Sequence, residues 1–104
     1  MMGIIKTLGT FGVGSIETTY QHLVSLLGEP IKLDTRYDFK SDVVWNMNVP
    51  GTNGGVVATI YNYKTGKNYL GEKGKDPEDI TRWHVGGNHP EFSLRYVKDK
   101  LGLI

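Results

Sequence analysis

Two runs of strand-forming residues, one on each side of a turn cluster near the middle of the chain, constrain the fold most. In the first run, the apolar residues Val43, Trp45, Met47 and Val49 alternate with Val44, Asn46 and Asn48. A period of two is typical of a half-buried strand. The second run, residues 56–63, is rich in β-branched and aromatic side chains. Residues 50–55 contain Pro, Asn and Gly, so the sequence predicts an antiparallel hairpin with a loop of about six residues.

An amphipathic helix is predicted before the hairpin. Ser15 is a suitable N-cap, because its hydroxyl can accept a backbone N–H of the first turn. The apolar residues that follow at helical spacing are Ile16, Tyr20, Leu23, Val24 and Leu27. Gly28 is expected to end the helix, and Pro30 prevents its continuation. Residues 1–14, which precede this helix, are expected to form a flexible lead-in or a short strand.

A second helix is predicted near the C-terminus. Asn88 is the expected N-cap, followed by Pro90 and Glu91 in the first turn. The residues expected to point inward from this helix are Phe92, Leu94, Val97 and Leu101. The helix completes a pattern in which strands lie between two terminal helices.

The segments between these elements predict further strands. Residues 31–42 carry charges of alternating sign and predict a solvated loop with a short edge strand. Asn68 to Gly71 is predicted as a short strand, and Ile80 to Val85 as a longer one that ends at Gly86 and Gly87. The predicted fold class is therefore α+β, with an antiparallel sheet of three to four strands. An N-terminal and a C-terminal helix are expected to pack together on one face of this sheet.

Length and composition limit the classes of protein. The chain has 104 residues, which is about one domain, so residues 1–104 are predicted to form a single domain. It has no cysteine, which excludes disulfides and thiolate metal sites. No stretch approaches the roughly twenty apolar residues that span a bilayer, so no membrane partner is predicted. The formal net charge of +1 is too small to indicate nucleic-acid binding by bulk electrostatics.

Three segments together resemble a known group of proteins. These are residues 57–71 (VATIYNYKTGKNYLG), residues 79–87 (DITRWHVGG), and the helix end Leu27 to Pro30 with Trp45 upstream. Together they resemble a family of small accessory proteins of tailed bacteriophages to which no chemistry is assigned. The resemblance implies a viral protein located in the cytoplasm of a host bacterium. It supplies no active site and no cofactor is predicted, and by analogy with small accessory phage proteins it favours a protein that binds and blocks a host factor.

The residues from Tyr61 to Lys75 form the strongest candidate binding site. Their aromatic and basic members are Tyr61, Tyr63, Lys64, Lys67, Tyr69, Lys73 and Lys75, and the only acid is Glu72. Four positive charges minus one negative charge leave a local charge of +3. Aromatic faces stack on bases and lysines neutralise phosphates, so this composition suits a nucleic-acid strand or a nucleotide. The alternative is a hairpin tip with solvated lysines, whose charge the acids Asp76, Glu78 and Asp79 largely cancel.

The segment from Trp83 to Gly87 forms a second candidate site. Adjacent strand residues point to opposite faces, so Trp83 and His84 are expected on opposite sides of the sheet. Gly86 and Gly87 precede a helix whose first N–H groups could receive an anion. The alternative is a packing tryptophan, an ordinary histidine and a turn. His84 and His89 do not have metal-ligand spacing, so no metal site is predicted.

The sequence leaves three functions open. The leading prediction is a non-enzymatic binding protein that sequesters or inhibits a host protein or a small host-derived ligand, in host takeover or anti-defence. The first alternative is a nucleic-acid or nucleotide binder that uses Tyr61, Tyr63, Lys64, Lys67 and Tyr69. The second is a small enzyme centred on His84, although no catalytic motif supports it. An exposed sheet face or edge strand would also favour a homodimer.

Overall fold

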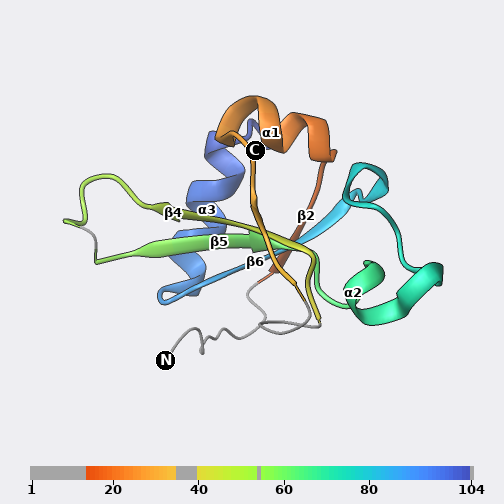
Figure 1. Cartoon of the computed structure of the whole chain (residues 1–104). Coiled ribbons are helices and arrows are strands. Elements are labelled where there is room, and N and C mark those ends of the chain that lie inside the picture. Colours follow the sequence, from red (N-terminus) through yellow and green to blue (C-terminus); the bar gives the residue numbers. More distant parts are fainter. Residues whose placement is uncertain (1–13, 35–39, 54, 104) are drawn as a thin grey trace. The chain divides into compact units, whose positions relative to one another are not determined.

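The computed structural model describes residues 14–34, 40–53 and 55–103, and it has an α+β fold (Figure 1). A five-stranded antiparallel sheet has the strand order β2-β6-β5-β4-β3. The strands are β2 (Gly14–Glu17), β3 (Ile31–Lys32), β4 (Val43–Asn48), β5 (Val57–Tyr61) and β6 (Arg82–Gly87). The α-helices are α1 (Tyr20–Leu27), α2 (Lys67–Leu70) and α3 (Pro90–Lys100). The predicted α+β class is confirmed, but the sheet has more strands than the three to four predicted.

The predicted start of the first helix is wrong. Ser15 and Ile16 lie in strand β2, and α1 begins only at Tyr20. Thr19 is the N-cap, and its hydroxyl accepts a hydrogen bond from the His22 N–H at 3.1 Å. The backbone N–H of Thr18 donates to the carbonyl of Thr81 at 2.9 Å, just before β6. Pairing of β2 with β6 therefore keeps the chain extended beyond Ser15, the predicted N-cap. The helix starts instead after the next suitable N-cap residue, Thr19.

The predicted hairpin and edge strand are confirmed, although the second strand ends at Tyr61 and not at residue 63. Strands β4 and β5 are neighbours in the sheet, and the Val49 N–H donates to the Val56 carbonyl at 2.9 Å, so the intervening loop matches the prediction. Strand β3 pairs antiparallel with β4, with Ile31 opposite Val44. Because β3 lies at the end of the strand order, it is the predicted short edge strand.

The predicted strand at Asn68 to Gly71 is wrong. Lys67–Leu70 forms the one-turn helix α2, followed by a 3₁₀ turn at Gly71–Lys73 and another at Pro77–Asp79. Strand β6 starts at Arg82 rather than at Ile80, because the second 3₁₀ turn precedes it. The residues after β5 therefore fold into turns instead of adding a strand.

The predicted C-terminal helix is confirmed, but its predicted N-cap and one of its predicted inward residues are wrong. His89 is the N-cap, whereas the side chain of Asn88 bonds to the Val57 N–H at 2.9 Å and to the Gly55 carbonyl at 2.8 Å. Phe92, expected to point inward, is 67% exposed, and its neighbour Ser93 is fully buried. Val97 and Leu101 are buried as predicted, so the prediction fails only in the first turn, where Ser93 takes the inward position expected for Phe92.

The described chain divides into two compact units. The first contains α3 together with Asn46–Ile60 and His84–Ile104, and the second contains α1 and α2 within Glu17–Trp45 and Tyr61–Trp83. The placement of the helices differs from the prediction that an N-terminal and a C-terminal helix pack on one sheet face, since α1 belongs to the second unit and α3 to the first. That residues 1–104 form a single domain stays a prediction, and most of the predicted lead-in lies outside the described residues.

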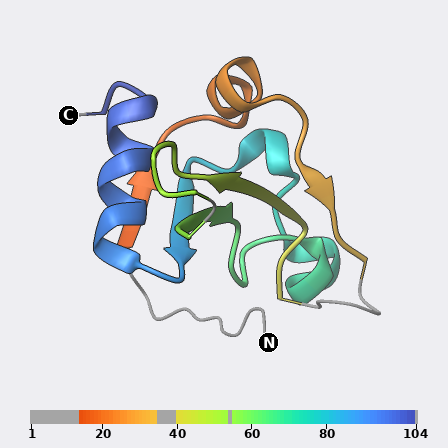
Figure 2. The ribbon, with the colours of Figure 1, turned by 90° about the vertical axis from the view of Figure 1, so that its left-hand side faces the viewer.

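In the first unit, α3 packs close to its strands. Figure 2 shows α3 running beside β2, and a Cβ atom added at Gly14 would lie 2.8 Å from the Leu94 side chain. The buried hydroxyl of Ser93 donates to the Val57 carbonyl at 3.3 Å. Gly87 has φ +146, and a Cβ there would lie 2.2 Å from the same carbonyl, so only glycine fits. Ile16, Ala58, Ile60, Val85, Val97 and Leu101 form the apolar core of this unit.

In the second unit, two tryptophans and a tyrosine form the tryptophan cluster: Trp45, Trp83 and Tyr20. The rings of Trp45 and Trp83 are 5.4 Å apart in an edge-to-face arrangement, and Tyr20 of α1 lies 5.8 Å from Trp45. The indole N–H of Trp83 donates to the Thr18 carbonyl at 3.1 Å, and that of Trp45 donates to the Gly28 carbonyl at 2.8 Å. Both indoles thus reach carbonyls that flank α1, one before it and one after it, and so fix both of its ends.

Candidate functional site

A segment of the second unit, residues 61–75, leaves strand β5 and is here called the lobe. Its base is held by Asn62, which is fully buried. The Asn62 side-chain oxygen accepts hydrogen bonds from the backbone N–H groups of Asp42 at 2.9 Å and Val43 at 3.1 Å. Its amide donates to the Asp42 carboxylate at 3.2 Å. A buried amide with its partners satisfied holds the two segments in one register.

Asp42 and Asn68 hold the middle of the lobe. The Asp42 carboxylate accepts from the backbone N–H groups of Lys67 at 3.1 Å and Asn68 at 3.4 Å, the first residues of α2. The Asn68 amide donates to the carbonyls of Leu33 at 2.9 Å and Ser41 at 2.8 Å. These bonds explain why Lys67–Leu70 forms a helical turn rather than a strand, since a carboxylate satisfies N–H groups that a first helical turn leaves unpaired.

The far end of the lobe closes on its beginning. The Lys75 N–H donates to the Thr65 carbonyl at 3.0 Å, within a bridge between Gly66 and Lys75. A Cβ atom at Gly74 would lie 2.3 Å from the Gly66 backbone, so this approach requires glycine. The lobe is therefore a closed loop with a defined shape, and its side chains project from a fixed backbone.

Three tyrosines and a lysine gather on the lobe and form the tyrosine–lysine cluster: Tyr61, Tyr63, Lys64 and Tyr69. The Lys64 ammonium lies 5.2 Å from the centre of the Tyr63 ring and 5.4 Å from that of Tyr69, and Tyr61 lies 6.3 Å from Tyr63, edge to face. Tyr63 is 36% and Tyr69 42% exposed. The lobe thus presents aromatic rings and a cation together at the surface.

Lys64 reaches this position through an unusual backbone conformation. Its φ of 60° is left-handed, which costs a residue with a Cβ atom about 1–2 kcal/mol. The Lys64 N–H donates to the Lys40 carbonyl at 2.7 Å and helps to hold it there. Backbone strain of this kind gathers at ligand clamps and other functional sites.

Lys67 belongs to the lobe but does not join the cluster. Its ammonium lies 3.1 Å from the carboxylate of Asp76, and both side chains are more than half exposed. Ion pairs of such exposure contribute about 0–1 kcal/mol to stability. Asp76 therefore neutralises Lys67 rather than the lysines at the other positions of the lobe.

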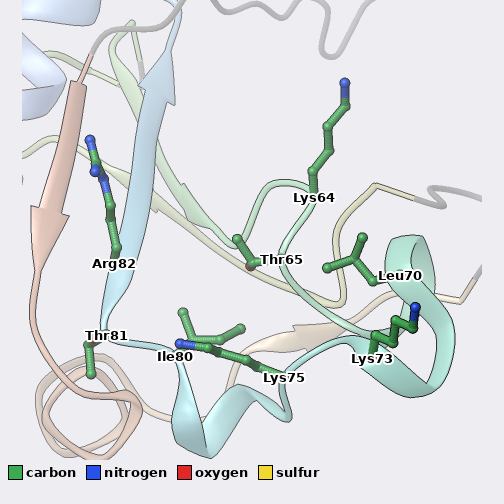
Figure 3. Close-up of a pocket in the computed structure, with 8 residues that line it drawn as sticks. All are labelled: Lys64, Thr65, Leu70, Lys73, Lys75, Ile80, Thr81 and Arg82. Carbon is green, nitrogen blue, oxygen red and sulfur yellow. The ribbon is translucent and has the colours of Figure 1, made fainter.

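A hollow of about 260 Å³ lies beside the cluster, within the second unit (Figure 3). Its apolar lining includes Leu70 and Ile80, and its cations are Lys64, Lys73, Lys75 and Arg82. No carboxylate lines it, and no described carboxylate pairs with Lys73, Lys75 or Arg82. The predicted cancellation by Asp76, Glu78 and Asp79 therefore does not extend to this hollow.

Thr65 contributes an unpartnered polar atom to the lining. Its hydroxyl oxygen is buried and has no hydrogen-bond partner, alone among the buried side-chain polar atoms of the described residues. Leaving such a group unpaired costs about 1–3 kcal/mol. The hollow thus contains a hydrogen-bonding group whose partner is not within the described protein.

Trp83 and His84 do not join these side chains. Trp83 has no exposed surface and belongs to the tryptophan cluster, so it is not available to a ligand. His84 is a half-buried residue of β6 with polar or ring contacts of its own, and it belongs to the first unit. The structure thus brings together four of the seven predicted site residues, namely Tyr61, Tyr63, Lys64 and Tyr69.

Several residues of the hollow were not among the predicted site residues. Thr65 and Leu70 are flanked by the predicted tyrosines and lysines, but neither residue type signals a site. Ile80 and Arg82 lie beyond the acidic residues, and no local pattern connects them with the lobe. Only the closure of the lobe brings these residues to one place.

Other chemistry finds little support in the described part of the chain. Residues 14–34, 40–53 and 55–103 contain no group of three or more His, Cys, Asp or Glu side chains that could hold a metal ion. Within the same residues, no helix has the length and apolar character needed to cross a membrane.

No protein-family description, curated protein or solved structure matches the chain. The resemblance to bacteriophage accessory proteins stays a prediction.

Proposed function

We propose that this chain is a non-enzymatic binding protein whose lobe holds a phosphate-bearing ligand of the nucleotide or nucleic-acid class. The observation that carries the proposal is the Lys64 ammonium lying over the exposed rings of both Tyr63 and Tyr69, next to a hollow lined by four cations. Bases stack on aromatic side chains, and each stacked base contributes about 1–3 kcal/mol of binding free energy. Lysine and arginine neutralise phosphates at a short distance from the stacked base.

The arrangement of these side chains supports a binding site better than it supports the alternative, a hairpin tip with solvated lysines. Lysines that serve only solubility need no ordered surroundings, whereas the exposed Lys64 lies over ring faces and has a left-handed backbone. The two predicted features of the site, aromatic faces and positive charge, lie on one closed segment. No described acid lines the hollow beside them.

A salt-dependent titration tests the proposal. We expect single-stranded DNA of eight nucleotides and a panel of mononucleotides to raise the unfolding midpoint of the protein at 50 mM salt, because a ligand that binds only the native state stabilises it. Binding should fall steeply as salt rises, since phosphate contacts release counterions. Lys64→Gln should weaken binding, and Lys100→Gln, an exposed lysine of α3, is the matched control. No shift with any ligand, or equal binding at 50 and 300 mM salt, would contradict the proposal.

The predicted capture of a host protein is the second candidate, and one observation favours it. Tyr63, Tyr69 and Leu70 of the lobe are each at least one-third exposed. Tyrosine is enriched at protein interfaces, where it supplies much of the binding energy. Affinity capture from bacterial lysate should then retain a partner on the wild-type protein and lose it with Tyr69→Ala. Capture that is equal for both proteins would count against this candidate.

The enzyme centred on His84 stays a prediction without a geometric argument. His84 lies in the first unit, whereas the lobe and the hollow lie in the second. A His84→Ala variant that keeps the full biological effect of the wild type would remove its main support.

A further inference from the structure

The hollow beside the tyrosine–lysine cluster has the properties of a subsite for a doubly charged oxyanion. Its four cations face no lining carboxylate, so the site carries a strong uncompensated positive charge. A carboxylate ligand would bring one negative charge, whereas a phosphate monoester brings about 1.5 to 2 and three strong acceptor oxygens. The charge of the lining therefore favours a phosphate monoester over a carboxylate.

The buried hydroxyl of Thr65 is an independent observation that indicates a ligand. The oxygen has no partner within the described protein, although it is buried in the lining of the hollow. Rotation about the Cα–Cβ bond moves a threonine hydroxyl between staggered positions without moving the backbone. The backbone of Thr65 is itself held by the bond from Lys75 at 3.0 Å. A ligand oxygen in the hollow would supply the missing acceptor.

The cations surround the hollow instead of converging on one point. Figure 3 shows Arg82 on β6 and Leu70 on α2 on opposite sides of Thr65, with Lys75 alongside Ile80. Like charges repel, so long basic side chains spread apart around a rim. A bound anion would attract their nitrogens inward, and the long flexible stems of lysine and arginine permit this movement.

Lys64 connects the hollow with the tyrosines. It lines the hollow, and its ammonium also lies over the rings of Tyr63 and Tyr69. A ligand with its phosphate in the hollow would therefore have its remaining part close to two exposed aromatic rings. A base joined to a terminal phosphate has this composition.

We infer that the hollow binds a terminal phosphate monoester of a nucleotide, with the Thr65 hydroxyl donating a hydrogen bond to a phosphate oxygen and with Lys75 and Arg82 neutralising its charge. The inference rests on the proposed function and narrows it, because a phosphodiester inside a strand carries one charge and no free end. Two sources supply this chemistry, a mononucleotide and the 5′-phosphorylated end of an oligonucleotide.

Matched pairs of ligands test the inference. Binding is measured for AMP against adenosine, and for one eight-nucleotide DNA strand with a 5′-phosphate against the same strand with a 5′-hydroxyl. A preference of about tenfold or more for the phosphorylated member of either pair is expected, since hydrogen bonds to charged groups are among the stronger ones. A preference in the AMP pair alone identifies the free nucleotide as the source, and one in the strand pair alone identifies a strand end. Equal affinity within both pairs overturns the inference of a terminal-phosphate site. If both DNA strands nevertheless bind, the proposed nucleic-acid-binding function still stands.

Two variants test the named residues. Thr65→Val keeps the shape of the side chain and removes the hydroxyl, so it should abolish most of the phosphate preference while the unfolding midpoint stays equal or rises, because an unpaired buried polar atom is lost. Arg82→Gln should reduce the preference as well, with Lys100→Gln as the control that leaves it unchanged. A Thr65→Val protein that is folded and keeps the full preference for phosphorylated ligands would overturn the role assigned to Thr65.

Discussion

The second unit contains two aromatic clusters of similar composition and opposite surroundings. The tryptophan cluster is packed in the core, where Trp83 has no exposed surface and Trp45 has 4%. The tyrosine–lysine cluster lies at the surface, where Tyr69 is 42% exposed. In the first cluster the indole N–H groups are bonded to backbone carbonyls beside α1. In the second, a lysine ammonium lies over the rings of Tyr63 and Tyr69.

The surroundings of an aromatic ring decide whether it can only stabilise the fold or can also contact a ligand. An aromatic ring whose polar atom is bonded and whose faces are covered stabilises the fold and has nothing left for a ligand. An exposed ring on a backbone held by Asn62 and Asp42 is accessible from solvent, and a backbone held in this way would lose little further entropy if a partner bound. The two clusters should therefore respond differently to the same kind of mutation.

The largest expected effect is on stability, in the tryptophan cluster. Trp83→Ala removes a fully buried side chain and its bond to Thr18, and we expect the free energy of unfolding to fall by about 3–5 kcal/mol. Tyr69→Ala, at the exposed cluster, should change it by less than about 1 kcal/mol. Chemical denaturation of both variants measures the difference. Similar losses in the two variants would mean that the clusters do not differ as described.

A smaller loss of stability is expected at the base of the lobe. Asn62→Ala leaves the backbone N–H groups of Asp42 and Val43 without their acceptor, at a cost of about 2–4 kcal/mol. Asn48→Ala, at an exposed position at the end of β4, is the matched control and should change stability by about 0.5 kcal/mol or less. Denaturation measures both, and hydrogen exchange should show faster exchange of the lobe amides in Asn62→Ala alone. Unchanged exchange in the lobe would show that Asn62 does not hold it.

The next effect concerns binding rather than stability. Tyr63→Leu keeps apolar bulk but removes the aromatic face, so nucleotide binding should weaken by about 1–3 kcal/mol while the unfolding midpoint changes little. Fluorescence titration with a labelled DNA strand measures the affinity. Tyr96→Leu, on α3 of the other unit, is the comparison that should bind as well as the wild type. Full affinity in Tyr63→Leu would remove stacking from the proposed function.

The smallest effect is a pH dependence in the tryptophan cluster. Burial raises the pKa of Tyr20 above its ordinary value of 10.0, and the carboxylates of Glu29 and Glu78 raise this pKa further. Because the folded state binds the phenolic proton more tightly, the contribution of Tyr20 to stability is present below about pH 10 and is lost as the pH rises through the raised pKa. The stability of the wild type should therefore fall more between pH 9 and pH 11.5, in rough terms, than that of Tyr20→Phe. Parallel pH profiles would refute the assignment.

Prediction from sequence succeeded where the signal was local. The alternation in residues 43–49 correctly placed Val43 and Trp45 in the core, and Gly28 ended α1 as expected. It failed where a distant partner decided the outcome. Pairing with β6 held Ser15 in a strand, and the Asp42 carboxylate turned Lys67–Leu70 into a helix. Neither partner is visible in a short window of sequence.

The candidate site was predicted in the same partial way. Composition located the tyrosines and lysines of residues 61–75, because the ability of an aromatic ring to stack and the positive charge of a lysine depend on residue type alone. It could not separate Trp83, which packs, from Tyr69, which is exposed, since both read as aromatic. It also could not identify Thr65 or Arg82, whose importance depends on which atoms surround them.

The sequence by itself determined the hairpin, the approximate positions of α1 and α3 and the chemical character of the lobe, since periodicity, capping residues and composition act over a few neighbouring positions. Tertiary structure alone decided which aromatic rings are covered, where the acids pair, and that Lys75 and Arg82 share a hollow with Thr65. These outcomes depend on contacts between residues far apart in the chain. Burial and hydrogen bonding, which give a side chain its role, are properties of such contacts.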